Sequence, residues 1–395
     1  MTYVHALQSN LAHHDNTIDP FTLAADDLDI LTKSMLECVA VAQHPVLNHA
    51  ASYFLDIQGK RVRPVIVVLM GRATSYATTT KSVEQSSPLL PLQEPASPSG
   101  LGSSLLQGLG SLLPSQLKLA EITEMIHTAS LLHDDVIDVS DKRRGMGSVN
   151  SIFGNQLAVL AGDFLLARAS VSLARLRDCD VVELVSNVIE HLVRGEVIQM
   201  KDDRGIGGNN NNGSDMGVGG GWLWKGSLRS VGELFENYMA KTFYKTASLM
   251  ANSCRAATML AGHAARVADA AYDYGKHVGI AFQLIDDVLD MTASTSILGK
   301  PALNDLEQGL VTAPVIYALE QFPELQYAID RKFEGSGDVE SAVKCVRDAR
   351  GIEKTRELAR QHAEKAVLAL EQALPPSEYR SALVNMVDRV LLRQK

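Results

Sequence analysis

The sequence predicts an all-α fold, a bundle of amphipathic helices, and three observations support this. The 395 residues are 46% hydrophobic, 5% aromatic and 21% charged, a composition typical of a soluble globular protein that is rich in Ala, Leu and Val. No alternating apolar and polar run with hairpin-turn residues competes for a strand assignment. Apolar residues recur at helical spacing over long segments instead. These segments are residues 117–138, 156–176, 181–200, 234–261, 265–291 and 352–374.

Two segments interrupt the helical pattern. The first, from about residue 78 to residue 116, is rich in Ser, Pro, Leu and Gly and is typical of an inserted loop. The second, from about 205 to 226, contains a run of Asn and three consecutive Gly, a composition that cannot offset its own ordering entropy. We interpret the chain, residues 1–395, as a single domain with these two inserts.

The overall composition excludes several classes of protein. A net charge of −9 argues against a nucleic-acid-binding surface. No stretch of 18 or more apolar residues occurs, so we expect no transmembrane helix, although contact with a membrane surface stays open. The cysteines are widely spaced and form no zinc-binding pattern, which favours a reducing compartment. The first fourteen residues contain neither Lys nor Arg, so no clear targeting presequence is visible.

The acidic motif Asp134-Asp135-Val136-Ile137-Asp138 follows an apolar helical run. Its outer carboxylates are four residues apart, so they lie on one helix face about 6 Å apart. Like charges at this spacing repel and call for a cation, and oxygen ligands with phosphate nearby suit Mg²⁺. A solvated acidic helix end remains the alternative for a single motif of this kind. His127 lies two turns earlier on the same face.

Basic residues next to this motif suggest an anionic ligand. Arg143 and Arg144 follow the acidic motif directly, and paired guanidinium groups can bind the oxygens of a diphosphate while Mg²⁺ neutralises the rest. Near the N-terminus, Lys60 and Arg63 flank Pro64, which suits the first turn of a helix and therefore an anion-binding helix start. The sequence thus predicts more than one diphosphate site.

A second acidic motif, Asp286-Asp287-Val288-Leu289-Asp290, repeats the design far along the chain. Two such motifs, each ending an apolar helical run, are much more specific than one, although chance recurrence in an acidic protein is the alternative. The repeat predicts carboxylates from two helices around a metal–diphosphate cluster. Lys245, Thr246 and Lys300 are further polar candidates near these helices.

Taken in order, the segments GKRVRP, LLHDDVIDVSDKRRG, YKTASLM, FQLIDDVLD and LGKP resemble the trans-polyprenyl diphosphate synthases. The resemblance implies the isoprenoid-synthase helical bundle around a deep central cavity. It also implies repeated condensation of isopentenyl diphosphate onto an allylic diphosphate, with Mg²⁺ as cofactor. Assembly as a homodimer, or as a heteromer with a second subunit, is a further implication.

The resemblance also assigns roles to particular residues. The residues implied to bind isopentenyl diphosphate are Lys60, Arg63, His127 and Arg144. Those implied to bind the allylic diphosphate or to stabilise its cation are Arg143, Lys245, Thr246, Gln283 and Lys300. The principal metal ligands are implied to be Asp134 and Asp138 in the first motif, with Asp135 in support, and Asp286 in the second. Asp287 and Asp290 are implied to serve the second metal site as well.

Small side chains near the first motif suggest the length of the product. Ser130 lies one turn before Asp134, with Ala129 beside it, where a growing chain would have to pass. Relatives that make short products often have an aromatic residue there. This sequence has no aromatic residue there, and in this respect it resembles the long-chain enzymes that supply ubiquinone side chains. In eukaryotes those enzymes are mitochondrial. The alternatives are a geranylgeranyl diphosphate synthase and a non-catalytic subunit of a heteromeric synthase, although such subunits typically lose motif residues that are intact here.

Overall fold

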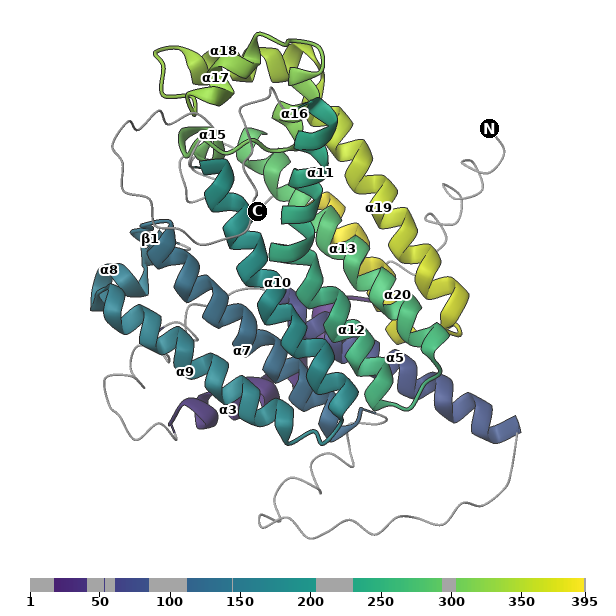
Figure 1. Ribbon diagram of the computed structural model, residues 1–395. Coiled ribbons are helices and arrows are strands. Elements are labelled where there is room, and N and C mark those ends of the chain that lie inside the picture. The colour runs from purple at the N-terminus through teal and green to yellow at the C-terminus, as the bar shows by residue number, and fades with distance from the viewer. Residues whose placement is uncertain are drawn as a thin grey trace, which may run out of the picture. The chain divides into compact units, whose positions relative to one another are not determined.

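The described part of the chain is almost entirely helical, which confirms the all-α prediction (Figure 1). A computed structural model describes residues 18–40, 53, 61–84, 112–143, 145–203, 230–292 and 303–393. Its longer helices are α3 (Ala25–Ala40), α5 (Val62–Glu84), α7 (Pro114–Ile137), α9 (Asn155–Ala174), α10 (Cys179–Asp203), α11 (Val231–Thr242), α12 (Ser248–Leu260), α13 (Ala265–Thr292), α18 (Asp338–Asp348), α19 (Gly351–Ala373) and α20 (Glu378–Leu392). Shorter helices are α2 (Pro20–Leu23), α8 (Val149–Phe153), α15 (Asn304–Glu307), α16 (Ala313–Leu319) and α17 (Leu325–Asp330).

The expected helical segments agree with these helices, with one interruption. The segment 234–261 is divided into α11, a π-helical turn η1 (Phe243–Ala247) and α12. A π-helical turn adds one residue to a helical turn and occurs frequently at functional sites. Periodicity alone could not predict it, because the apolar spacing on either side is that of one continuous helix.

The chain groups into two compact units. Unit 1 comprises residues 1–189, 249–278 and 364–389, and unit 2 comprises residues 190–248, 279–363 and 390–395. Several long helices contribute residues to both units. The expectation of a single domain stays a prediction.

The core of unit 1 is centred on α7, which packs against α9 and α5 (Figure 1). Pro114 opens α7, and the side chain of Gln116 accepts a hydrogen bond from the backbone N–H of Leu113 at 3.0 Å. The inner face of the helix buries residues such as Leu119, Ile122 and Leu132, all 0% exposed. Burial of each such side chain stabilises the fold by about 1.5–3 kcal/mol. The acidic motif therefore lies at the end of a helix that the core holds in place.

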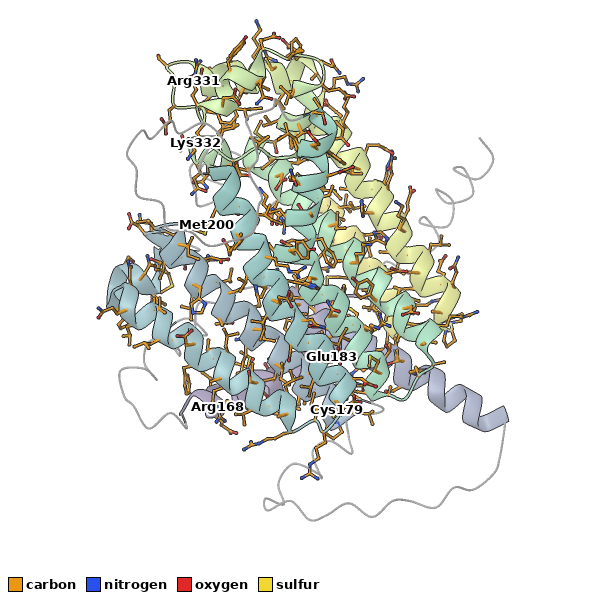
Figure 2. All side chains as sticks on the ribbon, in the orientation of Figure 1. Arg168, Cys179, Glu183, Met200, Arg331 and Lys332 are labelled. Atoms are coloured by element: carbon orange, nitrogen blue, oxygen red, sulfur yellow. The ribbon has the colours of Figure 1, made fainter. Side chains whose placement is uncertain are left out.

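Unit 2 has two apolar clusters. One, which includes Tyr238, Ile280 and Leu284, joins α11, α13 and α16. The other lies among α15 to α18 and includes Phe333. Figure 2 shows Arg331 at the end of α17, where its Nε donates to Asp338 at 2.6 Å. The first cluster supports α13, the helix that carries the second acidic motif.

Two local features differ from the sequence-based expectation. A short antiparallel pair, β1 (Lys142–Arg143) and β2 (Met146–Gly147), follows α7, although no hairpin was expected. Two residues per strand are too few to produce an alternating pattern. The second difference concerns the insert expected at 78–116. Helix α5 continues to Glu84 and α7 begins at Pro114, so both ends of that expected insert are helical. The rest of that insert, and the insert at 205–226, lie outside the described residues.

Within the part of the chain that the structure describes, α9 alone is long and apolar enough to cross a membrane. Its mean hydropathy is 1.6, and 39% of the window is buried. The core helix of a soluble protein meets the same criteria, so this finding is weak evidence for a membrane span, which the sequence did not lead us to expect. Several apolar side chains of α9 are exposed, including Leu160 at 57% and Val171 at 41%.

His277 on α13 predicts a pH-dependent stability. Burial, together with the positive charges of Lys276 and Lys365, lowers its pKa from 6.5 to about 4, against the opposing effect of Asp273. Between about pH 6.5 and 4 the unfolded chain binds a proton that the folded protein does not, so stability falls as the pH falls through this window. Because the imidazole is partly exposed, we expect a loss of about 1–2 kcal/mol. Urea unfolding at pH 7 and pH 5 measures it, and His277→Gln should reduce the difference. An unchanged difference in that variant would contradict this assignment.

Candidate active site

Two of the predicted isopentenyl diphosphate ligands are in contact. Arg63, in the first turn of α5, places Nη1 2.8 Å from Nε2 of His127 on α7, and both side chains are half-buried. A guanidinium group only donates, so Nε2 accepts and the imidazole proton is on Nδ1. Pro64 follows Arg63 within the first helical turn, as the sequence predicted. The helix start and the His-bearing face of α7 therefore meet in unit 1.

The carboxylates of the first acidic motif differ in exposure. Asp134 is half-buried and Asp138, which ends α7, is exposed, whereas the side chain of Asp135 is 2% exposed. Arg143 binds Asp135 in bidentate fashion, with Nε 2.8 Å from Oδ2 and Nη2 2.7 Å from Oδ1. The middle acid is thus neutralised by an arginine, and the outer two acids remain accessible to solvent.

The short hairpin holds Arg143 in this position. Its strands pair Arg143 with Met146, and Gly145 in the turn has φ of 80°, a conformation that glycine adopts without strain. Asn150 donates to the backbone oxygens of Asp135 and Ser140, each at 3.1 Å, and so ties the end of α7 to α8. Other guanidinium N–H groups of Arg143 remain for a ligand, because the group has five donors. Its predicted role in diphosphate binding stays a prediction.

Lys245 and Thr246 lie in the π-helical turn η1 of unit 2. The Nζ atom of Lys245 donates to Oε1 of Gln199 at 2.8 Å and forms an ion pair with Glu196, both on α10. The close approach requires Gly195, because a Cβ atom there would lie 2.5 Å from Cγ of Lys245. The ammonium group is therefore held by a carboxylate and an amide rather than extended freely into solvent.

The acids of the second motif also differ in their exposure to solvent. Asp286 on α13 is 46% exposed and forms an ion pair with Arg393, whose guanidinium lies 3.9 Å from the ring centroid of Phe282. Asp290 accepts a hydrogen bond from the backbone N–H of Asp305 at 3.1 Å. Asp287, the middle acid, is 2% exposed. In both motifs the middle carboxylate is buried and the first is more exposed to solvent, and we call such solvent-accessible carboxylates the open acids.

Asp287 accepts hydrogen bonds from several elements of unit 2. Tyr238 on α11 donates to Oδ2 at 2.6 Å, and Nε2 of Gln283 donates to Oδ1 at 2.9 Å. The backbone N–H of Ala313 at the start of α16 also donates to the carboxylate. Burial raises the pKa of Asp287 to about 6, although these donors act to lower it. Burial, and then the negative charge of Asp287, raise the pKa of Tyr238 well above 10.0.

Three of the predicted site residues lie outside the part of the chain that the structure describes. These are Lys60, Arg144 and Lys300. Within the described ranges, no three His, Cys, Asp or Glu side chains gather closely enough to hold a metal ion alone. Mg²⁺ commonly uses only one or two carboxylates and completes its shell with water and substrate phosphate. The open acids Asp134 and Asp138 in unit 1, and Asp286 in unit 2, fit this mode of binding.

The Polyprenyl synthetase family matches residues 44–346 of the chain, which is more than half of its length. The chain belongs to the polyprenyl synthetase family.

Known proteins similar to this family member include solanesyl and hexaprenyl diphosphate synthases. It is 43% identical to the mitochondrial solanesyl-diphosphate synthase 1 of Oryza sativa subsp. japonica, covering 98% of this chain and 82% of that protein. It is 45% identical to a probable mitochondrial hexaprenyl pyrophosphate synthase of Neurospora crassa, covering 96% and 82%. A crystal structure of a polyprenyl synthase from Caulobacter crescentus, complexed with calcium and isoprenyl diphosphate, is 26% identical with a TM-score of 0.73, covering 97% of this chain and 99% of that one.

Several residues of this polyprenyl synthetase site were not identified from the sequence. Glu196 and Gln199 contact Lys245, Tyr238 contacts Asp287, and Arg393 contacts Asp286. The spacing of three between Glu196 and Gln199 on an amphipathic helix, and of seven between Tyr238 and Lys245, could have suggested shared helix faces. No sequence signal links Arg393 to a carboxylate more than a hundred residues earlier.

Proposed function

We propose that the protein is a trans-prenyltransferase that adds isopentenyl diphosphate repeatedly to an allylic diphosphate and releases a long-chain all-trans polyprenyl diphosphate. One observation carries the proposal: a chain of the polyprenyl synthetase family has two acidic motifs, each with a first carboxylate that is partly exposed to solvent and a buried middle carboxylate that accepts hydrogen bonds from neighbouring side chains. Such a division suits a site in which some acids bind a ligand and others hold the surrounding groups in place.

The open acids are proposed to bind magnesium together with the allylic diphosphate. Asp134 and Asp138 would hold it from the first motif, and Asp286 from the second, with Asp290 in support. Bound Mg²⁺ would neutralise the diphosphate and make it a better leaving group. The similar Caulobacter crescentus protein was crystallised with calcium and isoprenyl diphosphate, which supports a cation and an isoprenoid diphosphate as ligands of this fold.

The other polar residues would bind and orient the substrates. The guanidinium of Arg63, with His127 and the predicted ligands Lys60 and Arg144, would bind isopentenyl diphosphate. Lys245, Arg143 and the predicted ligand Lys300 would bind the allylic diphosphate. When the allylic C1–O bond breaks, oxygen atoms of Gln283 and Thr246 would stabilise the cation. The double bond of isopentenyl diphosphate then supplies the electrons of the new C–C bond, and a proton passes to the released diphosphate.

The long-chain product and the compartment are proposed from the relatives. Both the solanesyl and the hexaprenyl enzymes named above make long products by their names, and both are named as mitochondrial. The absence of an aromatic residue at Ser130 agrees with a long product. We therefore propose a mitochondrial enzyme that supplies the ubiquinone side chain.

A homodimer is proposed as the working assembly. The exposed apolar side chains Val159, Leu160 and Val171 on α9 are candidates for burial between two copies. Light scattering on the purified protein should give twice the mass of 42.7 kDa. A monomer mass with full activity would contradict the dimer. Activity that appears only after a second subunit is added would instead support a heteromer.

A product assay tests the proposed activity. The purified protein, with Mg²⁺, an allylic primer and radiolabelled isopentenyl diphosphate, should yield products of thirty carbons or more on thin-layer chromatography. A product that stops at twenty carbons would overturn the long-chain proposal in favour of a geranylgeranyl diphosphate synthase. Absence of incorporation, with and without a partner subunit, would overturn the synthase function.

The close contact of Gly279 on α13 with the π-helical turn η1 should be required for full activity. A Cβ atom at this position would lie 2.5 Å from Cα and 2.8 Å from Cβ of Ala247, in the turn that carries Lys245 and Thr246. Gly279→Ala should therefore displace the turn, costing about 1–3 kcal/mol of stability and lowering kcat roughly tenfold or more. Initial rates and thermal unfolding measure both effects.

Gly232→Ala is a matched control in the same unit. A Cβ atom at Gly232, on the exposed side of α11, would meet only Oγ of Ser230, at 3.8 Å. This variant should keep its stability and its rate. Equal activity in the Gly279→Ala and Gly232→Ala variants would show that the close packing of α13 against the turn is not required.

A further inference from the structure

The hydrogen bonds around Asp287 form a chain with a single consistent direction. Thr246 donates from Oγ1 to Oε1 of Gln283 at 3.0 Å. Gln283 donates from Nε2 to Oδ1 of Asp287 at 2.9 Å, and Tyr238 donates to Oδ2 at 2.6 Å. An ionised carboxylate only accepts, so the amide nitrogen of Gln283 must face Asp287 and the amide oxygen must face Thr246.

The direction of this amide matters for a reaction that passes through a cation. An amide oxygen carries partial negative charge and has two lone pairs, of which Thr246 uses one. The reversed amide would present N–H donors, which carry partial positive charge and would repel a developing cation. Fixed dipoles that face developing charge are among the largest contributions to catalysis. Asp287 thus determines which end of the Gln283 amide faces the turn that carries Thr246.

The burial and the partners of Asp287 distinguish it from the open acids. It is 2% exposed, and Tyr238, Gln283 and the N–H of Ala313 use three of its acceptor positions. A metal ion would have to enter a buried site in which this carboxylate already accepts three hydrogen bonds. Asp286, its neighbour in the chain, is 46% exposed. The adjacent acids are therefore suited to different tasks.

We propose that Asp287 and Tyr238 are positioning residues for prenyl transfer: they hold the Gln283 amide with its oxygen toward Thr246 and the reacting allylic carbon. Neither residue binds the metal or the substrate. Tyr238 fixes the carboxylate from α11, and the carboxylate in turn fixes the amide on α13. This inference rests on the proposed prenyltransferase function.

The experiment exchanges the carboxylate at position 287 and the amide at position 283. Asp287→Asn replaces one of the two acceptor oxygens by an amide donor, so position 287 no longer holds the Gln283 amide in one orientation. Gln283→Glu places a second carboxylate in contact with the buried carboxylate of Asp287. The double variant Gln283→Glu/Asp287→Asn restores a donor at position 287 opposite an acceptor at position 283. It also keeps an oxygen toward Thr246 and conserves the net charge. We measure kcat, the KM for the allylic substrate and the Mg²⁺ concentration for half-maximal rate, with thermal unfolding to confirm that each variant is folded.

Each single variant should lose roughly 10²-fold in kcat, with little change in KM or in the Mg²⁺ requirement. The double variant should recover at least tenfold relative to Gln283→Glu, because the hydrogen-bond pair is rebuilt. A metal ligand would respond differently, because an amide at position 287 would raise the Mg²⁺ requirement in both variants that contain it.

Tyr238→Phe tests the tyrosine separately. Removal of its hydroxyl should lower kcat by roughly tenfold at an unchanged Mg²⁺ requirement, because the carboxylate loses its closest donor. Tyr317→Phe on α16 is the matched control, since Tyr317 packs against Phe235 through its ring, which the variant keeps. Equal rates for Tyr238→Phe and Tyr317→Phe would overturn the assignment of Tyr238.

The outcomes for this inference and for the proposed function are separable. An active wild-type protein whose double variant shows no recovery, or whose Asp287→Asn variant needs much more Mg²⁺, overturns the positioning role alone. A wild-type protein that incorporates no isopentenyl unit overturns the proposed function and this inference with it.

Discussion

Asp134→Asn should abolish most of the prenyl transfer while leaving the fold intact. Asp134 is half-buried at the end of α7 and is not part of the apolar core. An amide at this position would weaken the proposed binding of Mg²⁺ and the allylic diphosphate, which stabilises the departing diphosphate. A loss of about 4 kcal/mol of transition-state stabilisation corresponds to roughly a 10³-fold fall in kcat/KM. Steady-state rates over a Mg²⁺ titration measure the effect.

Asp141→Asn is the control for this prediction. Asp141 is exposed, lies three residues beyond the motif and uses its backbone oxygen, not its carboxylate, to accept from Ser148 and Ser151. It removes the same charge from the same loop region and should leave the rate unchanged. Similar losses in the two variants would mean that general acidity near α7, and not a metal-binding carboxylate at Asp134, supports the reaction.

Ser130→Phe should shorten the product. Ser130 is half-buried, lies one helical turn before Asp134 and donates its hydroxyl to the backbone oxygen of His127 at 2.9 Å. A phenyl ring there would occupy space next to the proposed diphosphate site, where the lengthening chain must pass. We expect the main product to fall from thirty carbons or more to twenty or fewer. Chromatography of the dephosphorylated products measures this.

The choice of Ser130 follows from the burial of its neighbour. Ala129 is 0% exposed and packs inside unit 1, so a phenylalanine there would overpack the core and cost about 1–3 kcal/mol. Ser130→Ala is the control, because it removes the hydroxyl without adding volume, and its product length should not change. A folded and active Ser130→Phe variant with the wild-type product length would remove Ser130 from the path of the chain.

The fold was largely predictable, because helical periodicity is a strong signal over long segments. The windows at 156–176 and 265–291 agree closely with α9 and α13. The π-helical turn at Lys245 was not predictable, since one inserted residue hardly changes the apolar pattern. The short hairpin at Arg143 was missed because two-residue strands have no detectable period.

The residue types of the candidate site were predictable from the sequence. Which of its acids are buried and paired, and which are exposed, was not. The sequence gives Asp134 and Asp135 the same chemistry, yet Asp135 is bound by Arg143 and Asp134 is more open. Similarly, nothing in the sequence distinguishes Asp286 from Asp287. Their difference arises from partners distant in sequence, such as Tyr238, which lies 49 residues from Asp287. Contacts at such separations depend on tertiary packing, which periodicity does not encode.

A crystal structure with Mn²⁺ and an unreactive allylic thiolodiphosphate tests the central claim most directly. The account predicts anomalous peaks beside the carboxylates of Asp134 and Asp138, and beside the carboxylate of Asp286, together with bound diphosphate. Asp135 and Asp287 should keep their hydrogen bonds to Arg143 and Tyr238. Metal bound to Asp287, or diphosphate bound away from both acidic motifs, would contradict the account.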